Sequence, residues 1–131
     1  MMERSKDWID EAEGDLLHAQ NDLNGKFYNW ACFSAQQATE KAIKAVFNKI
    51  GVDIWGHSVT DLLLELTKHY FVPSDLIDDA IELDKVYIVA RYPDAHVSGS
   101  PRRKFTEREA RRLIEYAERI FKFCSDLLSK I

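Results

Sequence analysis

The chain has 131 residues, of which 46% are hydrophobic and 31% are charged, and its formal net charge is −4. This length suits one domain, residues 1–131, and the composition excludes a disordered polar chain. The charge excludes a uniformly basic nucleic-acid coat. Because the sequence has no export signal and no apolar run approaching ~20 residues, we expect a cytoplasmic protein without a membrane span.

The first two predicted helices follow the three- and four-residue spacing of apolar side chains. One runs over residues 3–23, and Asn24-Gly25 ends it because both residue types tolerate the left-handed conformation. The other runs over residues 28–50 and carries a seam of small residues, on which a second helix can approach closely. The seam consists of Ala31, Ala35, Ala38, Ala42 and Ala45.

The same second helix sets two polar residues between aromatic ones. Gln37 and Glu40 lie on a row that begins with Trp30 and Phe33 and ends at Phe47. They are either partly buried with their hydrogen bonds satisfied, or they face a cleft. In functional terms they either line the site considered below or only cross-link helices.

The rest of the chain predicts two more helical segments, a loop and a last helix. A short helix over residues 59–70 has Ser58 as its N-cap, and a longer one runs over residues 73–90. Pro93 opens a loop to residue 105, and a capping box at Thr106 starts the last helix. The predicted architecture is all-α: an up-and-down four-helix bundle with one additional short helix.

The loop opens with Arg91-Tyr92-Pro93-Asp94-Ala95-His96. An arginine fork matches phosphate oxygens, and histidine exchanges a proton near neutral pH. The stretch predicts phosphate binding or phosphodiester chemistry, with Arg91 and His96 as the catalytic candidates. Alternatively, the arginine pairs with a carboxylate and the histidine is a solvated loop residue. Asp84, two helical turns before Arg91, either orients the guanidinium or forms only an ion pair on the helix face.

A basic run follows on the same loop. Arg102, Arg103 and Lys104 precede further arginines at positions 108, 111 and 112. Together with Arg91, the first three are candidates for holding flanking phosphates, which would make binding sensitive to salt. The alternative is a solvated face of the molecule.

The two cysteines, Cys32 and Cys124, each lie in an apolar helical pattern. They form no CxxC motif and pair with no histidine, so the sequence predicts buried reduced thiols and no metal site.

Several stretches spread along nearly the whole chain carry a family resemblance. They are Trp8, Ala12, Asp15-Leu16 and Ala19, then Gly25-Lys26-Phe27-Tyr28, residues 32–45, Gly56-His57-Ser58 and Arg91-Tyr92-Pro93-Asp94. In this order they resemble the HEPN domain family. The resemblance implies a four-helix bundle that is usually dimeric, and many members are encoded beside a minimal nucleotidyltransferase as toxin and antitoxin.

The resemblance also implies an activity. Active members are metal-independent endoribonucleases, and their signature is an arginine and a histidine separated by four to six residues. Arg91 and His96 have four residues between them. A tyrosine that the antitoxin can adenylylate often follows two positions after the histidine. This sequence departs from that pattern, because Ser98 stands there. We expect no cofactor.

Cleavage of RNA through its 2′-hydroxyl needs a base, an acid and a cation that stabilises the phosphoryl oxygens. One chain offers one histidine in the motif, whereas a two-fold dimer would offer two histidines and two arginines. A nuclease of this kind should therefore have a composite site.

The leading interpretation is a homodimer that binds RNA or nucleotide phosphate, pairs with a minimal nucleotidyltransferase and has endoribonuclease activity as a further step. A non-catalytic nucleotide-binding or partner-docking module, or a purely structural helical scaffold, are the alternatives.

Overall fold

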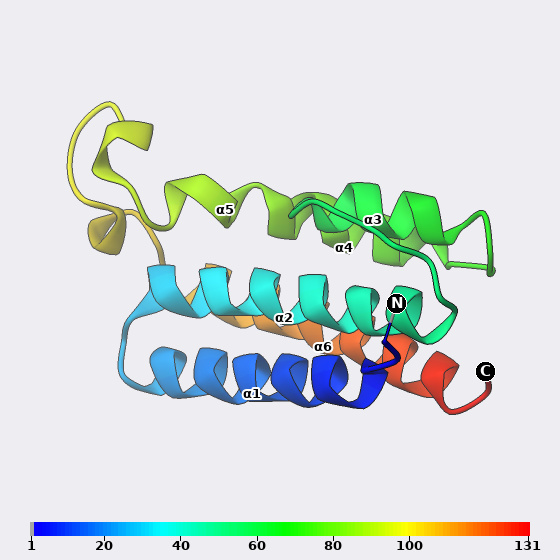
Figure 1. The fold of residues 1–131 in the computed structure, drawn as a ribbon. Coiled ribbons are helices and arrows are strands. Elements are labelled where there is room, and N and C mark those ends of the chain that lie inside the picture. Colours follow the sequence, from blue (N-terminus) through cyan, green and yellow to red (C-terminus); the bar gives the residue numbers. More distant parts are fainter. Residues whose placement is uncertain (1) are drawn as a thin grey trace.

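The computed structural model describes residues 2–131 and shows an all-α, up-and-down bundle (Figure 1). The predicted four-helix bundle with one short helix is confirmed, with α4 and α5 together forming the fourth long rod and α3 as the short helix. Within the described residues, no helix is both long and apolar enough to cross a membrane. In chain order the helices are α1 (Ser5–Asn24), α2 (Tyr28–Lys49), α3 (Val59–Leu66), α4 (Ser74–Asp84), α5 (Val86–Val89) and α6 (Glu107–Leu128).

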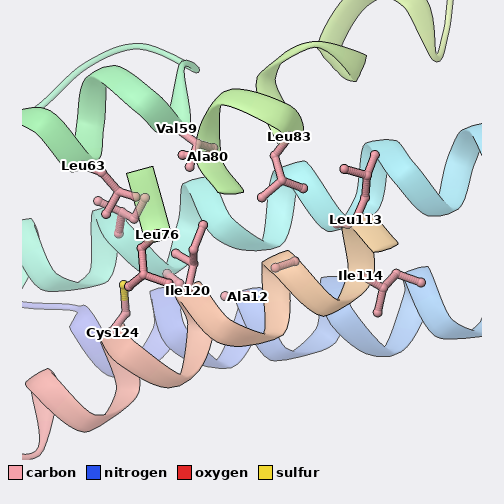
Figure 2. Packing of buried hydrophobic residues seen from close by; sticks show 14 of the residues in the cluster. Ala12, Val59, Leu63, Leu76, Ala80, Leu83, Leu113, Ile114, Ile120 and Cys124 are labelled. Carbon is pink, nitrogen blue, oxygen red and sulfur yellow. The ribbon is translucent and has the colours of Figure 1, made fainter. Parts of the chain in front are cut away.

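Helix α2 lies at the centre of the bundle and packs against α1, α6, α3 and the α4–α5 rod. All five alanines of the predicted seam have no exposed surface, which confirms that small residues let neighbouring helices approach closely. Figure 2 shows side chains of four helices meeting in this core, among them Ala12 of α1, Leu63 of α3, Leu83 of α4 and Ile120 of α6.

Both cysteines lie in the core, as predicted. Cys32 and Cys124 are fully buried free thiols. Burial raises the pKa of each thiol to about 12. At neutral pH both therefore stay protonated and unreactive, because the thiolate is the nucleophilic form.

The N-terminal caps predicted for two helices are present. The Ser58 hydroxyl accepts a hydrogen bond from the Asp61 amide at 3.1 Å, and the Thr106 hydroxyl accepts one from the Glu109 amide at 3.0 Å. Each satisfies an amide that has no partner in the first helical turn.

The predicted fourth helix is wrong in one respect, because it is interrupted. Helix α4 ends at Asp84 and α5 begins at Val86. Lys85 between them keeps right-handed helical angles, φ −60° and ψ −24°. The helical spacing of apolar side chains continues across Lys85, so the sequence pattern does not reveal the break between α4 and α5. The third helix also ends earlier than expected, at Leu66.

The turn between α1 and α2 differs from the expectation. Gly25 keeps a negative φ of −82°, whereas Lys26 adopts the left-handed conformation with φ 67°. The positive φ therefore falls on a residue with a Cβ atom, one position after the glycine.

The long connection between α5 and α6 projects beyond the helices at the end where α1 turns into α2 (Figure 1). It contains two short 3-10 turns, η1 (Pro93–Ala95) and η2 (Pro101–Arg103). A proline starts each turn, where its fixed φ fits and its missing amide proton is not needed.

Candidate functional site

Arg91 lies half-buried just after α5, where aromatic rings surround its guanidinium group. Its Nε and Nη2 donate to the Tyr87 carbonyl oxygen at 3.0 and 2.8 Å. The guanidinium carbon lies 4.3 Å from the centre of the Phe33 ring, 4.6 Å from that of Tyr87 and 4.9 Å from that of Tyr92. Cation–π attraction and the two hydrogen bonds thus hold a permanent cation in place.

One end of the guanidinium group keeps donors for a ligand. Nη1 makes only a long contact, 3.4 Å, with the Tyr92 hydroxyl. The group is anchored to a backbone carbonyl rather than to a carboxylate, so its charge is not neutralised there. The alternative in which Arg91 is paired with a nearby carboxylate does not describe this site.

His96 is half-buried and is anchored on the same short helix. Its Nε2 lies 2.7 Å from the Val89 carbonyl oxygen. A carbonyl only accepts, so Nε2 carries the proton and Nδ1 is the nitrogen that can exchange one. His96 is therefore a bonded residue and not simply a solvated loop histidine.

Asp84 was expected to orient Arg91 or to pair with it, and both expectations are wrong. Its carboxylate accepts hydrogen bonds from the Val59 and Thr60 amides at 2.9 and 2.8 Å, and from the Ser58 hydroxyl at 3.0 Å. It caps the amino end of α3, where free amides and the helix dipole favour a negative charge. The prediction assumed one continuous helix and did not include these amides as competitors.

Glu40 and Gln37 take part in contacts that link helix α2 to the segment before α3. Glu40 is buried, with Oε1 3.1 Å from His57 Nδ1 and Oε2 3.2 Å from Lys44 Nζ. Gln37 donates to the Gln36 side-chain oxygen at 2.8 Å, and the Gln36 amide donates to the His57 carbonyl oxygen at 2.8 Å. Glu40 therefore ties α2 to the segment that precedes α3, and Gln37 supports Gln36, which makes the second link.

His57 is the residue that sequence reasoning missed. Its ring stacks on Tyr87 with centroids 5.5 Å apart and planes 16° apart, and 62% of its side chain is exposed. It borders a pocket of about 190 Å³ that Ser58, Asp84, Tyr87 and Ile88 also line. The only signal in the sequence was Gly56-His57-Ser58 before a helix, and no spacing connected it with Glu40 or Arg91.

Apolar side chains continue outward from Arg91 over α2 and α5, and we call this surface the aromatic face. Trp30 packs edge-on against Phe33 with centroids 6.0 Å apart, and Phe33 lies 6.0 Å from Tyr87. Trp30, Ile88 and Tyr92 are each nearly half exposed, at 45%, 49% and 47%. The face consists of Trp30, Phe33, Tyr87, Ile88 and Tyr92.

The basic run lies apart from these contacts. Arg102, Arg103 and Lys104 are exposed on the loop that carries His96. Arg111 and Arg112, further on, form ion pairs with Glu107 and Glu109 on α6. Among residues 2–131, no group of three or more His, Cys, Asp or Glu side chains is arranged to hold a metal ion.

Known proteins resemble the chain over nearly its whole length. The model of a family described as the HEPN domain matches residues 5–127. The crystal structure of TT1696 from Thermus thermophilus superposes with a TM-score of 0.92 at 44% identity, over 95% of this chain and 98% of that one. A HEPN domain protein from Thermotoga maritima has a TM-score of 0.80 at 52% identity, with the same two coverages. A putative toxin of Methanocaldococcus jannaschii is 24% identical, over 96% of this chain and 89% of the relative.

Proposed function

The chain belongs to the HEPN domain family, and from that premise we propose that it is a toxin-type protein that binds RNA and cleaves it without a metal ion. It acts as a homodimer and pairs with a minimal nucleotidyltransferase. The likeness to a protein named as a putative toxin supports the role in a toxin–antitoxin pair.

The observation that carries the proposal is the setting of Arg91. Its guanidinium group is held by the Tyr87 carbonyl and by three aromatic rings, and Nη1 keeps donor capacity. A cation fixed in this way needs little reorganisation to receive a phosphate group. The neighbouring aromatic face offers surfaces on which unpaired bases can stack, which favours single-stranded RNA.

The proposed chemistry uses the 2′-hydroxyl of RNA as the nucleophile. Arg91 stabilises the charge that builds on the phosphoryl oxygens, and His96 transfers a proton through Nδ1, since its Nε2 is bonded to the Val89 carbonyl. The products would be a 2′,3′-cyclic phosphate and a 5′-hydroxyl. A second proton-transfer group is required, and a dimer would bring a second copy of the motif.

The test compares purified wild type with Arg91→Ala and His96→Ala on a pool of single-stranded RNA, each with EDTA. Wild type should cleave in EDTA and leave cyclic phosphate ends, and each variant should lose at least ~10²-fold in rate. Arg111→Ala is the matched control, because Arg111 is paired with Glu107 on α6. Equal activity in wild type and His96→Ala would point to a contaminant or to another site.

Binding is measured separately, on a non-cleavable RNA analogue. Affinity should fall as salt rises, with a logarithmic slope of ~−0.7 for each phosphate contact. Arg91→Ala and the triple alanine variant of Arg102, Arg103 and Lys104 should each weaken binding and reduce that slope. If binding is indifferent to salt and to Arg91, the proposed phosphate site does not exist.

The pairing with a nucleotidyltransferase has its own test. The proposal expects a minimal nucleotidyltransferase gene beside the gene for this chain. When the two proteins are co-expressed, they should elute together in gel filtration. Expression of the chain alone should arrest growth, and co-expression of the transferase should relieve that arrest.

A non-catalytic nucleotide-binding module is the second candidate, and one observation favours it. The hydrogen bond from His96 to the Val89 carbonyl would also be made by a histidine that only braces the loop. Arg91-dependent binding without cleavage by wild type would select this function.

A further inference from the structure

We propose that His57, oriented by the buried Glu40, is the proton-accepting residue that acts with Arg91 on the phosphodiester of single-stranded RNA. This inference rests on the proposed function and deepens it, because it takes the second proton-transfer group from the same chain instead of from the second copy of the motif in a dimer.

Glu40 fixes how the His57 ring presents its two nitrogens. Glu40 is buried, with 5% of its surface exposed, and its Oε1 lies 3.1 Å from Nδ1 of His57. A carboxylate only accepts, so Nδ1 carries the proton and Nε2 keeps its lone pair when the ring is neutral. Lys44 binds the other oxygen of Glu40 at 3.2 Å, which holds the carboxylate in one orientation. A carboxylate that orients an imidazole in this way prepares it to accept a proton.

The His57 ring and the Arg91 guanidinium group both contact the Tyr87 ring. The His57 ring stacks on Tyr87 at 5.5 Å, and the Arg91 guanidinium carbon lies 4.6 Å from the centre of the same ring. The pocket of about 190 Å³ opens beside His57 and Tyr87. The proposal places the 2′-hydroxyl against His57 Nε2 in this pocket and the phosphoryl oxygens beyond its Tyr87 wall, towards Arg91, which does not line the pocket itself.

The charged groups around His57 are compatible with this role. Glu40 and Lys44 face it from α2, and Arg91 faces the shared Tyr87 ring from the end of α5. Asp84, which also lines the pocket, is engaged by the amino end of α3. The His57 imidazole is therefore the proton-transfer candidate in this group, because its Nδ1 is engaged by Glu40 and its Nε2 is not.

The proposed step transfers one proton to His57 and one proton from His96. His57 Nε2 takes the proton of the 2′-hydroxyl, the 2′-oxygen bonds to phosphorus, and the bond from phosphorus to the 5′-oxygen breaks. The leaving 5′-oxygen takes a proton from Nδ1 of a protonated His96, whose Nε2 stays bonded to the Val89 carbonyl in both states. Water then carries a proton from His57 back to His96, and both rings return to their starting forms.

A simpler role for His57 is to neutralise Glu40 and hold the segment before α3. His57→Gln separates the two roles. The glutamine amide can donate a hydrogen bond to Glu40, as Nδ1 does, but it cannot transfer a proton near neutral pH. His69→Ala is the matched control, because His69 is exposed at the end of α3 and lies outside the site.

The first experiment is the pH dependence of kcat for RNA cleavage. Wild type should give a bell-shaped profile, because a base must be deprotonated and an acid protonated. His57→Gln and His57→Ala should each lower kcat by at least ~10²-fold with little change in KM, and should abolish the acidic limb. His96→Ala should abolish the alkaline limb instead, and His69→Ala should change neither. Wild-type kcat and an intact acidic limb in His57→Gln would overturn the inference.

The second experiment does not depend on turnover. Inorganic phosphate and a nucleoside 2′-monophosphate are titrated into the protein, and the histidine C–H resonances are followed by NMR. Both ligands should move the His57 signal in wild type, and Arg91→Ala should abolish the movement. Arg91-dependent binding that leaves His57 unmoved would overturn the inference and leave the proposed function standing. A wild-type protein that neither binds these ligands nor cleaves RNA would contradict both the inference and the proposed function.

Discussion

At the scale of single residues, the carboxylate of Asp84 joins two helices rather than serving the site. It accepts from two backbone amides and two hydroxyls at the start of α3 while it forms the last residue of α4. If these amides lost the carboxylate, they would stay partly buried without a hydrogen-bond partner, and the free energy of their desolvation would destabilise the folded state. The sequence identified Asp84 as important but could not identify its partners, since they come from a segment 24 to 26 residues earlier.

Asp84→Ala should therefore destabilise the fold without touching Arg91. We expect a loss of roughly 1–3 kcal/mol in the free energy of unfolding, measured by urea denaturation. Asp78→Ala is the control, because Asp78 is exposed on the same helix and should change stability by less than about 0.5 kcal/mol. Equal effects of the two substitutions would contradict the capping role.

Asp79 makes a second residue-scale prediction, and it concerns pH. Burial raises the pKa of its carboxyl, while Arg119, whose Nε lies 3.4 Å away, lowers it and the nearby Asp75 and Asp78 raise it. A carboxyl whose pKa is raised on folding stabilises the fold while it is protonated, and that contribution is lost as pH rises through the folded-state pKa. At neutral pH the charged Asp79 is therefore a net cost.

Asp79→Asn should raise the melting temperature at pH 7, because the amide has a similar shape without the buried charge. The lost pairing with the half-exposed Arg119 is a small effect. The gain should shrink as pH falls and vanish below about 3.9, the ordinary pKa of aspartate. Thermal unfolding of both proteins between pH 3 and 7 measures this, and a variant that is less stable at pH 7 would refute it.

At the scale of elements, the spacing of apolar side chains predicted which segments are helical. It did not predict the points at which the backbone angles of a single residue end or turn a helix. The alanine seam and both predicted caps are present, because they depend on side chains that are close in sequence. The break at Lys85 and the left-handed Lys26 were not predicted. Both depend on how consecutive helices must turn to pack on each other, which no local pattern encodes.

The turn between α1 and α2 gives the prediction at this scale. Lys26 has φ 67°, which costs a residue with a Cβ atom roughly 1–2 kcal/mol. Lys26→Gly should relieve this strain, and part of the gain is offset by the larger backbone entropy of glycine in the unfolded state. We expect a net gain of about 0.5–1 kcal/mol in urea denaturation. Lys68→Gly, at a position without positive φ, should show no gain.

At the scale of the whole molecule, the sequence identified the loop of the candidate site but not the residues that surround it. Arg91 and His96 were found because they share one short stretch. His57, Tyr87 and Phe33 come from three separate elements and meet only when the bundle forms. Residues that a fold brings together from distant positions leave no spacing in a single sequence, so only the structure could connect His57 with Glu40 and with Tyr87.

The aromatic face also bears on the assembly of the molecule. Trp30, Ile88 and Tyr92 expose nearly half of their surfaces beside a charged site. Large exposed apolar side chains around one site are typical of interaction surfaces, and aromatic residues together with arginine are enriched in interfaces. We propose that a second copy of the chain covers part of this face about a two-fold axis, which would bring two Arg91 sites near each other.

This proposal predicts the mass of the particle in solution. Light scattering at micromolar concentration should give twice the 15.2 kDa of one chain, with an interface that buries ~1,200–2,000 Å² in total. Trp30→Glu places a charge on the aromatic face and should yield the single-chain mass with unchanged helical content. Leu17→Glu is the control, because Leu17 is 68% exposed on α1, and α1 does not contribute to the aromatic face. A wild type of 15.2 kDa, or a Trp30→Glu variant that keeps the double mass, would show that this face does not join two copies.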